Sequence, residues 1–317
     1  MRLYYPFSEA MREKYGQKLY KIPLHLPVTC PGRMPGGLGP CSYCSPMGTG
    51  YEMLDAKINL NEQLSRNIQY ISRKYNVTLF GAYFQNYTNT FLPASQLQEA
   101  LMQIQREDVK EIFLSTRPDC LGKDTARLLG EVSQRLQKEI TIELGLQSCN
   151  WKTLERINRG HSLAEFIDSV LTAKSFGLNV VAHVILDLPW DEPGDVIECS
   201  KILSALGVDG VKLHSLYIPK GCEMEPQLAE GKLTLLTQEE YVERAVEFLC
   251  WLSPDCVIHR LVGRIPKEYS VVANFHTSWW VIKEQIERTL EQRNLYQGAR
   301  WGYLDGSALR KAGLDKK

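Results

Sequence analysis

Three cysteines lie close together near the N-terminus, in a stretch rich in glycine and proline, VTCPGRMPGGLGPCSYCSP at residues 28–46. Ten residues separate Cys30 from Cys41, and Cys41 and Cys44 form a C-x2-C pair. Thiolates at this spacing are typical ligands of zinc or of an iron–sulfur cluster. Structural zinc would need a fourth ligand, and the nearest candidate is His25. A [4Fe–4S] cluster on three thiolates would instead leave one iron free for a substrate or cofactor.

The composition places these cysteines in a globular protein of 317 residues, 44% of them hydrophobic. Residues 1–16 are charged throughout and contain no signal-peptide segment, and no window approaches eighteen consecutive apolar residues. We therefore expect a cytoplasmic protein with no membrane segment. In a reducing compartment nine cysteines are not expected to form a disulfide framework, so clustered thiols indicate metal binding or chemistry.

The net charge is balanced, with 37 basic and 37 acidic residues, so composition gives no sign of a nucleic-acid-binding protein. Contact with RNA would need a local basic patch. The candidates for such a patch are Arg156, Arg159, His161, Arg260 and Arg264. Exposed arginines at helix ends are common, so an ordinary solvated surface explains the same residues equally well.

Six apolar, β-branched runs alternate with amphipathic segments of helical length. The runs are residues 21–28, 77–84, 111–116, 139–146, 178–188 and 208–218, and the helical segments are 59–75, 95–106, 122–137, 162–176 and 195–206. Ser162 and Glu165 are spaced as a capping box. This alternation predicts a parallel sheet with right-handed crossovers, and we expect an α/β fold with a partial TIM-type (β/α)6 barrel. An open doubly wound sheet is the alternative, but its G-x-G-x-x-G turn is missing after the first strand.

The chain after the sixth strand has a different pattern. We assign residues 1–218 to the barrel with its N-terminal segment, and residues 219–317 to a C-terminal extension packed on the barrel. A second capping box, Thr237 and Glu240, begins a helix in this extension. Strand alternation continues only in residues 255–263, so the extension is expected to be mainly helical.

The cysteine loop resembles that of the radical S-adenosylmethionine (SAM) superfamily, because an aromatic residue, Tyr43, precedes the last cysteine and the loop follows the first strand of a β/α series. Stretches over nearly the whole chain resemble the YhcC/YtqA (MnmL-like) group, which is related to the radical-SAM domain of the elongator catalytic subunit. These stretches are residues 14–25, 82–91, 115–120, 142–148, 153–161, 182–189, 207–221 and 257–263. The resemblance implies a radical SAM enzyme with two cofactors, a [4Fe–4S] cluster and SAM, and a reductant such as flavodoxin or ferredoxin.

In this family one electron from the cluster cleaves SAM, and the resulting 5′-deoxyadenosyl radical abstracts hydrogen from a carbon that acid–base chemistry could not activate. The resemblance makes Cys30, Cys41 and Cys44 the cluster ligands. It places Tyr43 beside the adenine. The other cofactor-binding candidates lie on or after the predicted strands: Gln85, Asn86, Ser115, Arg117, Glu143, Gln147 and Asp187.

Several of these polar residues also have a structural interpretation. Arg117 could pair with the nearby Asp119, and Gln85 and Asn86 could be ordinary turn residues. Glu143 lies within an apolar strand, where a carboxylate without a partner would be costly. That cost favours a functional role for Glu143.

The candidate catalytic residues are His183, Lys212 and His214, which interrupt otherwise apolar strands. Lys212 and His214 are two residues apart and so share one face of the sixth predicted strand. The alternative is that the histidines bond to backbone carbonyls and Lys212 extends to solvent. The chain also departs from the family after the fifth strand, where Asp187 and Trp190 stand in place of a glycine pair.

The resemblance points to tRNA as the partner. MnmL-like members of the group are understood to convert a carboxymethylaminomethyl group on the wobble uridine to aminomethyl. Such a reaction needs one base flipped into the barrel mouth, with the phosphates held outside. Two alternatives stay open: a radical SAM enzyme acting on a small molecule or peptide without RNA, and a non-catalytic metal-binding module in which the cysteine loop is structural.

Overall fold

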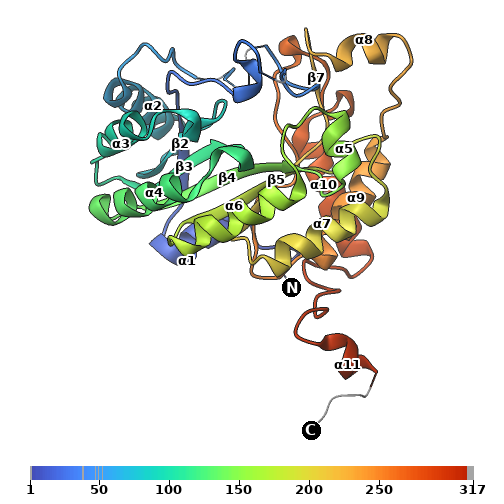
Figure 1. The fold of residues 1–317 in the computed structure, drawn as a ribbon. Coiled ribbons are helices and arrows are strands. Elements are labelled where there is room, and N and C mark those ends of the chain that lie inside the picture. The colour runs from blue at the N-terminus through green and yellow to red at the C-terminus, as the bar shows by residue number, and fades with distance from the viewer. Residues whose placement is uncertain (1, 38, 47, 49, 52, 313–317) are drawn as a thin grey trace.

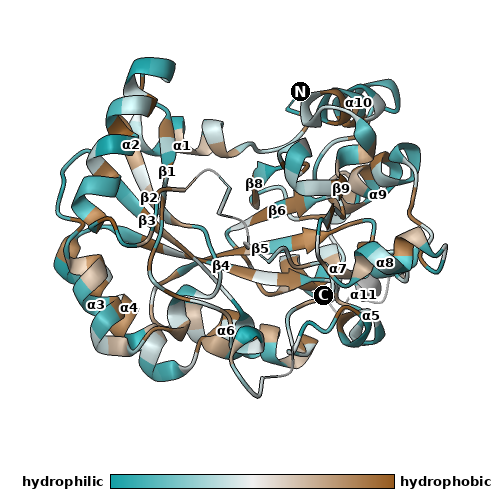
Figure 2. Ribbon diagram, turned by 90° about the horizontal axis from the view of Figure 1, so that it is seen from above, coloured by the Kyte–Doolittle hydropathy of each residue, from teal (hydrophilic) through white to brown (hydrophobic). Residues whose placement is uncertain are grey.

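The fold is built on a seven-stranded parallel sheet in a computed structural model that describes residues 2–312 apart from 38, 47, 49 and 52. The strands are ordered β1-β2-β3-β4-β5-β6-β8. Their bounds are β1 (Leu19–Leu24), β2 (Leu79–Phe84), β3 (Val109–Thr116), β4 (Glu139–Gln147), β5 (Asn179–Ile185), β6 (Gly210–His214) and β8 (Val257–Arg260). Seen from above, the strands curve around an interior and the helices lie outside them (Figure 2). The expected α/β partial barrel is confirmed.

Helices connect successive strands and cover the outer face of the sheet (Figure 1). The connecting helices are α2 (Leu60–Tyr75), α3 (Ala94–Met102), α4 (Lys123–Leu136), α5 (Trp151–Arg156), α6 (Leu163–Ser175) and α7 (Pro193–Ala205). Two further helices, α9 (Gln238–Trp251) and α10 (Trp279–Gln292), extend this layer, because α9 contacts both α7 and α10. The apolar faces of strands and helices meet in one large buried core.

The sequence explains where several helices begin. Asn59 caps α2, since its side chain accepts a hydrogen bond from the Glu62 N–H. Both expected capping boxes are confirmed, at the start of α6 and at the start of α9. β3 and β4 are buried on both faces along almost their whole length, as is expected of strands inside a helix-covered parallel sheet.

The seventh strand, β8, comes from the segment expected to be mainly helical. It pairs in parallel with β6, and the N–H of its Ile258 donates to the carbonyl of Tyr5 at 2.7 Å. Short alternating runs such as residues 257–260 give a weak strand signal on their own. The N-terminal helix α1 (Phe7–Tyr15), which the sequence pattern did not indicate, contacts both β1 and β8.

The barrel is open because its two edge strands, β1 and β8, do not pair with each other among the described residues. Pro23 lies in β1, where the missing N–H is tolerated because an edge strand has one unpaired side. The opening between β1 and β8 therefore leads into the interior of the sheet.

The remaining elements are short. β7 (Ile218–Pro219) and β9 (Ser270–Val272) form a small antiparallel pair, α8 (Met224–Ala229) lies near β7, and α11 (Ser307–Lys311) projects away from the body toward the C-terminus (Figure 1). Over the described residues, no helix has the length and apolar character needed to cross a membrane.

Candidate active site

A cavity of about 180 Å³ lies where the cysteine loop meets the carboxyl ends of the strands. Carboxyl ends of parallel strands are the usual place for a site in such folds. Most of the candidate residues line this central cavity: Cys30, Cys41, Tyr43, Cys44, Gln85, Ser115, Arg117, Glu143, Gln147, His183 and His214. The fold thus brings together side chains that are far apart in the chain, such as Cys30 and His214, which are 184 residues apart.

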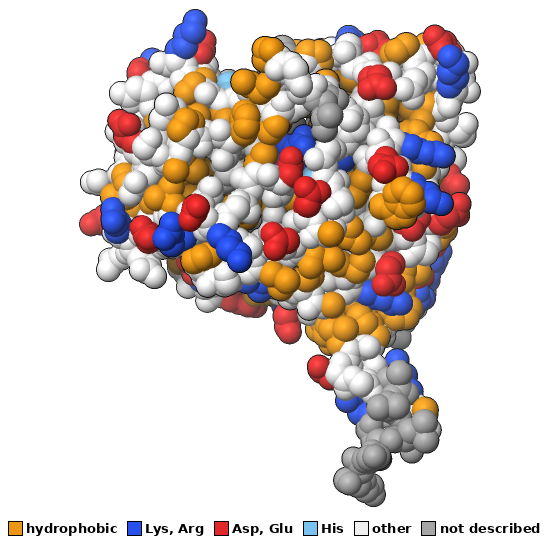
Figure 3. Space-filling model, in the orientation of Figure 1, with side chains coloured by type: hydrophobic (Ala, Val, Ile, Leu, Met, Phe, Trp, Pro, Cys, Tyr) orange, Lys and Arg blue, Asp and Glu red, His pale blue; other side chains and the backbone are white. Residues whose placement is uncertain are grey.

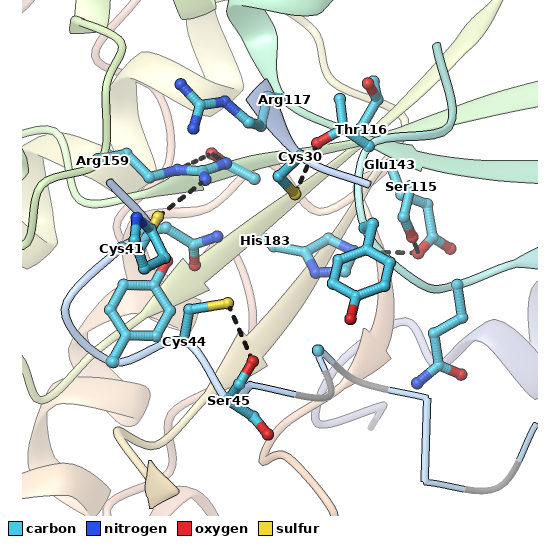
Figure 4. Close-up of a pocket in the computed structure, with 18 of the residues that line it drawn as sticks. Cys30, Cys41, Cys44, Ser45, Ser115, Thr116, Arg117, Glu143, Arg159 and His183 are labelled. Atoms are coloured by element: carbon cyan, nitrogen blue, oxygen red, sulfur yellow. Dashed lines mark hydrogen bonds and ion pairs between the residues drawn. The ribbon is translucent and has the colours of Figure 1, made fainter. Parts of the chain in front are cut away.

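The three thiols of the cysteine loop each have a polar neighbour. Cys30 Sγ lies 3.0 Å from the Thr88 hydroxyl, and Arg33 donates to Cys44 Sγ at 2.9 Å. Arg159 contacts Cys41 Sγ at 3.5 Å, and Figure 4 shows this contact beside the cavity. Two guanidinium groups therefore lie against the sulfur atoms, which favours a negatively charged group at this position.

The donor set of this loop fits an iron–sulfur cluster. Three soft thiol ligands face one cavity, and cationic donors lie next to two of them. Burial raises the pKa of Cys30 and Cys44, so an iron centre would have to displace their protons on binding. Among the residues with described positions, no three Cys, His, Asp or Glu side chains are grouped closely enough for a single metal ion.

Arg159 and His161 form part of the wall of the site rather than a surface patch. Both are buried, and both bond the Gly145 carbonyl: Arg159 Nη2 donates at 2.6 Å, and His161 Nε2 lies 2.9 Å away. Arg156, by contrast, is exposed over the ring of Trp190. The candidate basic patch is therefore split: Arg159 lies against the cysteine loop, His161 is buried beside Gly145, and Arg156 is at the surface.

Arg117 makes the pair with Asp119 that the sequence allowed. Its Nε and Nη2 atoms donate to the two carboxylate oxygens at 2.9 and 2.8 Å, and Nη2 also reaches the Gly160 carbonyl at 3.0 Å. Gly160 has a left-handed φ of 73°, and a Cβ there would lie 2.5 Å from Arg117 Nη2. Arg117 is thus held in place at the cavity wall by its partners.

A buried charge cluster forms the floor of the site around Glu143, which is fully buried. Lys21 Nζ lies 2.8 Å from Oε1, His183 Nε2 lies 3.0 Å from Oε2, and Lys212 also pairs with Oε2. Burial alone would raise the pKa of Glu143, but the two lysines and His183 hold it well below its usual range. The carboxylate that the sequence left without a partner therefore has three.

The two candidate histidines stack on each other, with ring centroids 5.2 Å apart. Burial and the adjacent Arg260 hold the pKa of His214 well below its usual range, and burial lowers that of His183 to about 4. Both imidazoles are therefore neutral near pH 7. Arg260 Nη2 contacts the His214 ring at 2.7 Å from Nε2.

Three candidates lie outside the lining of the central cavity. Asn86 is buried, with its amide nitrogen 3.4 Å from His25 Nε2. Lys212 faces Glu143 and the Tyr83 hydroxyl, at 3.0 Å from the latter, and lines a second cavity. Asp187 is buried, and its Oδ1 accepts a hydrogen bond from the Leu216 N–H at 2.6 Å.

Asp187 gives a prediction for stability. Burial raises its pKa from 3.8 to about 7, so the folded chain holds the Asp187 proton more tightly than the unfolded chain does. This group therefore lowers stability progressively as the pH rises from about 4 to about 7. Asp187→Asn cannot titrate there, so its unfolding free energy, measured in urea, should exceed that of the wild type by an amount that grows over this range. A constant difference would contradict the assignment, and the exposed Asp255→Asn serves as control.

Several residues at this site had no clear signal in the sequence. Arg33 and Thr88 contact thiols, and Tyr83 and Tyr217 line the cavity. Lys21 did carry a signal, because it is a charged residue in an apolar edge strand two positions from Pro23. Its partner, Glu143, lies 122 positions away, so the pairing itself becomes visible only in the fold.

Models of two known protein families match this chain, and one of the matches includes the cysteine loop. The Radical SAM superfamily matches residues 28–219, and the Radical_SAM C-terminal domain matches residues 208–292. The first match spans more than half of the chain and contains the cysteine loop. The chain belongs to the radical SAM superfamily, a family of enzymes that need a reductant and typically bind a [4Fe–4S] cluster and SAM.

Within this superfamily the chain groups with YtqA and YhcC, as its sequence indicates. It is 32% identical to YtqA of Bacillus subtilis over 93% of this chain and 92% of YtqA. It is 30% identical to YhcC of Escherichia coli over 93% of this chain and 94% of YhcC. The solved structure of archaeal Methanocaldococcus infernus Elp3 superposes with a TM-score of 0.65 at 16% identity, covering 88% of this chain and 64% of that one. That likeness supports the fold.

Proposed function

We propose that this chain binds a [4Fe–4S] cluster through Cys30, Cys41 and Cys44 and uses it, with SAM, to modify the wobble-uridine side chain of tRNA. When bound, the cluster supplies the electron that cleaves SAM reductively. The observation that carries the proposal is that the three thiols face one cavity at the carboxyl ends of the strands, with guanidinium groups against them.

The residues around the cavity have distinct roles in this proposal. Arg33 and Arg159 stabilise the negative charge of the cluster thiolates. Ser115 and Gln147 offer polar groups at the ends of β3 and β4 for the hydroxyl and carboxylate groups of SAM, and Tyr43 offers an aromatic wall for the adenine. The neutral pair of His183 and His214 lies on the substrate side.

The substrate side of the cavity suits a carboxylate. Arg260 lines the cavity, and its described contacts are with the neutral ring of His214 rather than with an acidic residue. A guanidinium in a partly buried site binds a carboxylate well, through paired hydrogen bonds. The carboxymethylaminomethyl group would place its carboxylate there. With SAM as the two-electron oxidant, the methylene between the nitrogen and the carboxylate would be oxidised to an imine, and water would release it as glyoxylate and leave an aminomethyl side chain.

The experiment that tests this function is anaerobic reconstitution with iron and sulfide, followed by dithionite and SAM. We expect 5′-deoxyadenosine to form, and tRNA carrying carboxymethylaminomethyluridine to increase its rate of formation. Mass analysis of the digested tRNA should show loss of the carboxymethyl mass from the wobble nucleoside. If 5′-deoxyadenosine forms at the same rate with and without every tRNA tested, the substrate is instead a small molecule or a peptide. Absence of both iron and cleavage would leave the cysteine loop with a structural role.

A further inference from the structure

A second and larger cavity, of about 610 Å³, lies between the two edge strands β1 and β8. We call it the lateral cavity. Basic and tyrosine side chains dominate its lining: Tyr20, Lys21, Tyr70, Lys74, Tyr75, Tyr83, Lys212, Arg260 and Arg264. Of the residues placed along its walls, none is acidic. The lateral cavity is therefore a basic, aromatic site in a protein whose net charge is zero.

The lateral cavity adjoins the central cavity. Tyr83, Gln85 and Arg260 line both, so a bound group in one lies next to a bound group in the other. Arg260 Nε is buried and has no hydrogen-bond partner, while its Nη2 contacts His214. A buried N–H donor without a partner is costly, and an anion bound at this junction would satisfy it.

The outer rim of the lateral cavity is formed by the C-terminal turn of α2. Tyr75 stacks on Tyr20 with ring centroids 5.0 Å apart, and 42% of Tyr75 is exposed. Lys74 Nζ lies 5.2 Å from the Tyr75 ring centroid and 5.6 Å from that of Tyr70, which is 61% exposed. Flat exposed rings beside a cation are the arrangement with which proteins hold single-stranded nucleic acid.

We infer that the lateral cavity binds the RNA strand next to the modified nucleotide, with a base against the exposed part of the Tyr75 ring and phosphates at Lys74 and Arg264. This inference rests on the proposed function for the class of substrate. The face drawn in Figure 3 has no comparable basic area, because acidic and basic side chains are intermixed over it. The lateral cavity provides the local positive charge that phosphate binding needs and that the balanced overall charge does not provide.

The test measures binding of a fluorescent anticodon stem-loop RNA by anisotropy over a range of KCl concentrations, using the reconstituted full chain. Lys74→Glu/Arg264→Glu should weaken binding at least about tenfold. It should also reduce the slope of log Kd against log salt by about 1.4, since each phosphate contact to a single strand contributes about 0.7. Lys123→Glu is a control for charge reversal away from the lateral cavity, because Lys123 is an exposed lysine in the first turn of α4, where an acidic residue is tolerated.

A second pair of variants tests the stacking. Tyr75→Ala should weaken RNA binding about fivefold or more, and Tyr75→Phe should retain wild-type affinity because the ring remains. Formation of 5′-deoxyadenosine without RNA should be the same in all of these variants, which shows that they fold and carry the cluster.

The outcomes separate this inference from the proposed function. If wild-type protein binds the RNA but Lys74→Glu/Arg264→Glu binds it with the same affinity and salt slope, the lateral cavity is not the RNA site and the function stands. If no RNA binds to the wild-type chain while SAM is cleaved, the result contradicts both the tRNA substrate of the proposed function and the RNA site at the lateral cavity.

Discussion

Replacement of Cys41 by alanine is expected to leave the reconstituted protein without its iron–sulfur cluster. A cluster with three protein ligands cannot lose one without also losing the arrangement that holds its iron, and Cys41 is the thiol that Arg159 contacts. Wild-type protein should bind about four iron and four sulfide per chain, and the variant close to none. Iron and sulfide analysis after anaerobic reconstitution measures this, together with the loss of 5′-deoxyadenosine formation.

The control for Cys41 is a cysteine outside the cavity. Cys222 is buried in the apolar cluster beneath the loop and lines neither the central nor the lateral cavity. Cys222→Ala should therefore keep full iron and sulfide content. A Cys41→Ala protein that retained wild-type iron and sulfide would overturn the ligand assignment, and equal loss in both variants would indicate that folding rather than ligation had failed.

The second large effect is expected from Glu143→Ala, which should lower the free energy of unfolding by about 3–5 kcal/mol. The substitution leaves the buried Lys212 and the partly buried Lys21 without the carboxylate that compensates them. Urea denaturation followed by circular dichroism measures the change. A loss of this size would show that Glu143 stabilises the fold, whether or not it also contacts a cofactor.

Two further variants make this prediction specific. Glu139→Ala removes a carboxylate from the same strand, but one that is 47% exposed and paired with Lys14 at the surface, so its cost should be below about 1 kcal/mol. Glu143→Leu/Lys212→Met replaces a charged pair by apolar side chains and should recover part of the lost stability. If Glu143→Ala unfolds at the wild-type urea concentration, the charge cluster does not stabilise the fold.

Local patterns in the sequence were sufficient to predict most of the fold. Apolar runs and helix starts depend on neighbouring residues, so the capping boxes at Ser162 and Thr237 predicted the starts of α6 and α9 directly. The strand β8 was harder, because it is four residues long and is stabilised by pairing with β6 and by contact with Tyr5. Such a short strand depends on tertiary context more than on its own residues.

The site was also partly predictable from local patterns in the sequence. The cysteines are close in sequence, and the end of a strand predicts a position at the cavity, as it did for Ser115 and Gln147. Asp187 shows the limit: it follows β5, yet its carboxylate accepts from the Leu216 N–H outside the cavity lining. Which way such a side chain turns is decided by contacts between segments, and a single sequence does not reveal them.

The late position of β8 in the chain has a consequence for biosynthesis. While the protein is being translated, β6 is an unprotected sheet edge until residues 257–260 have left the ribosome. Arg260, which lines both cavities, is the last residue of β8 and is synthesised with it. The two cavities are thus completed only near the end of synthesis. Until then the backbone groups of that β6 edge are free to pair with a strand other than β8.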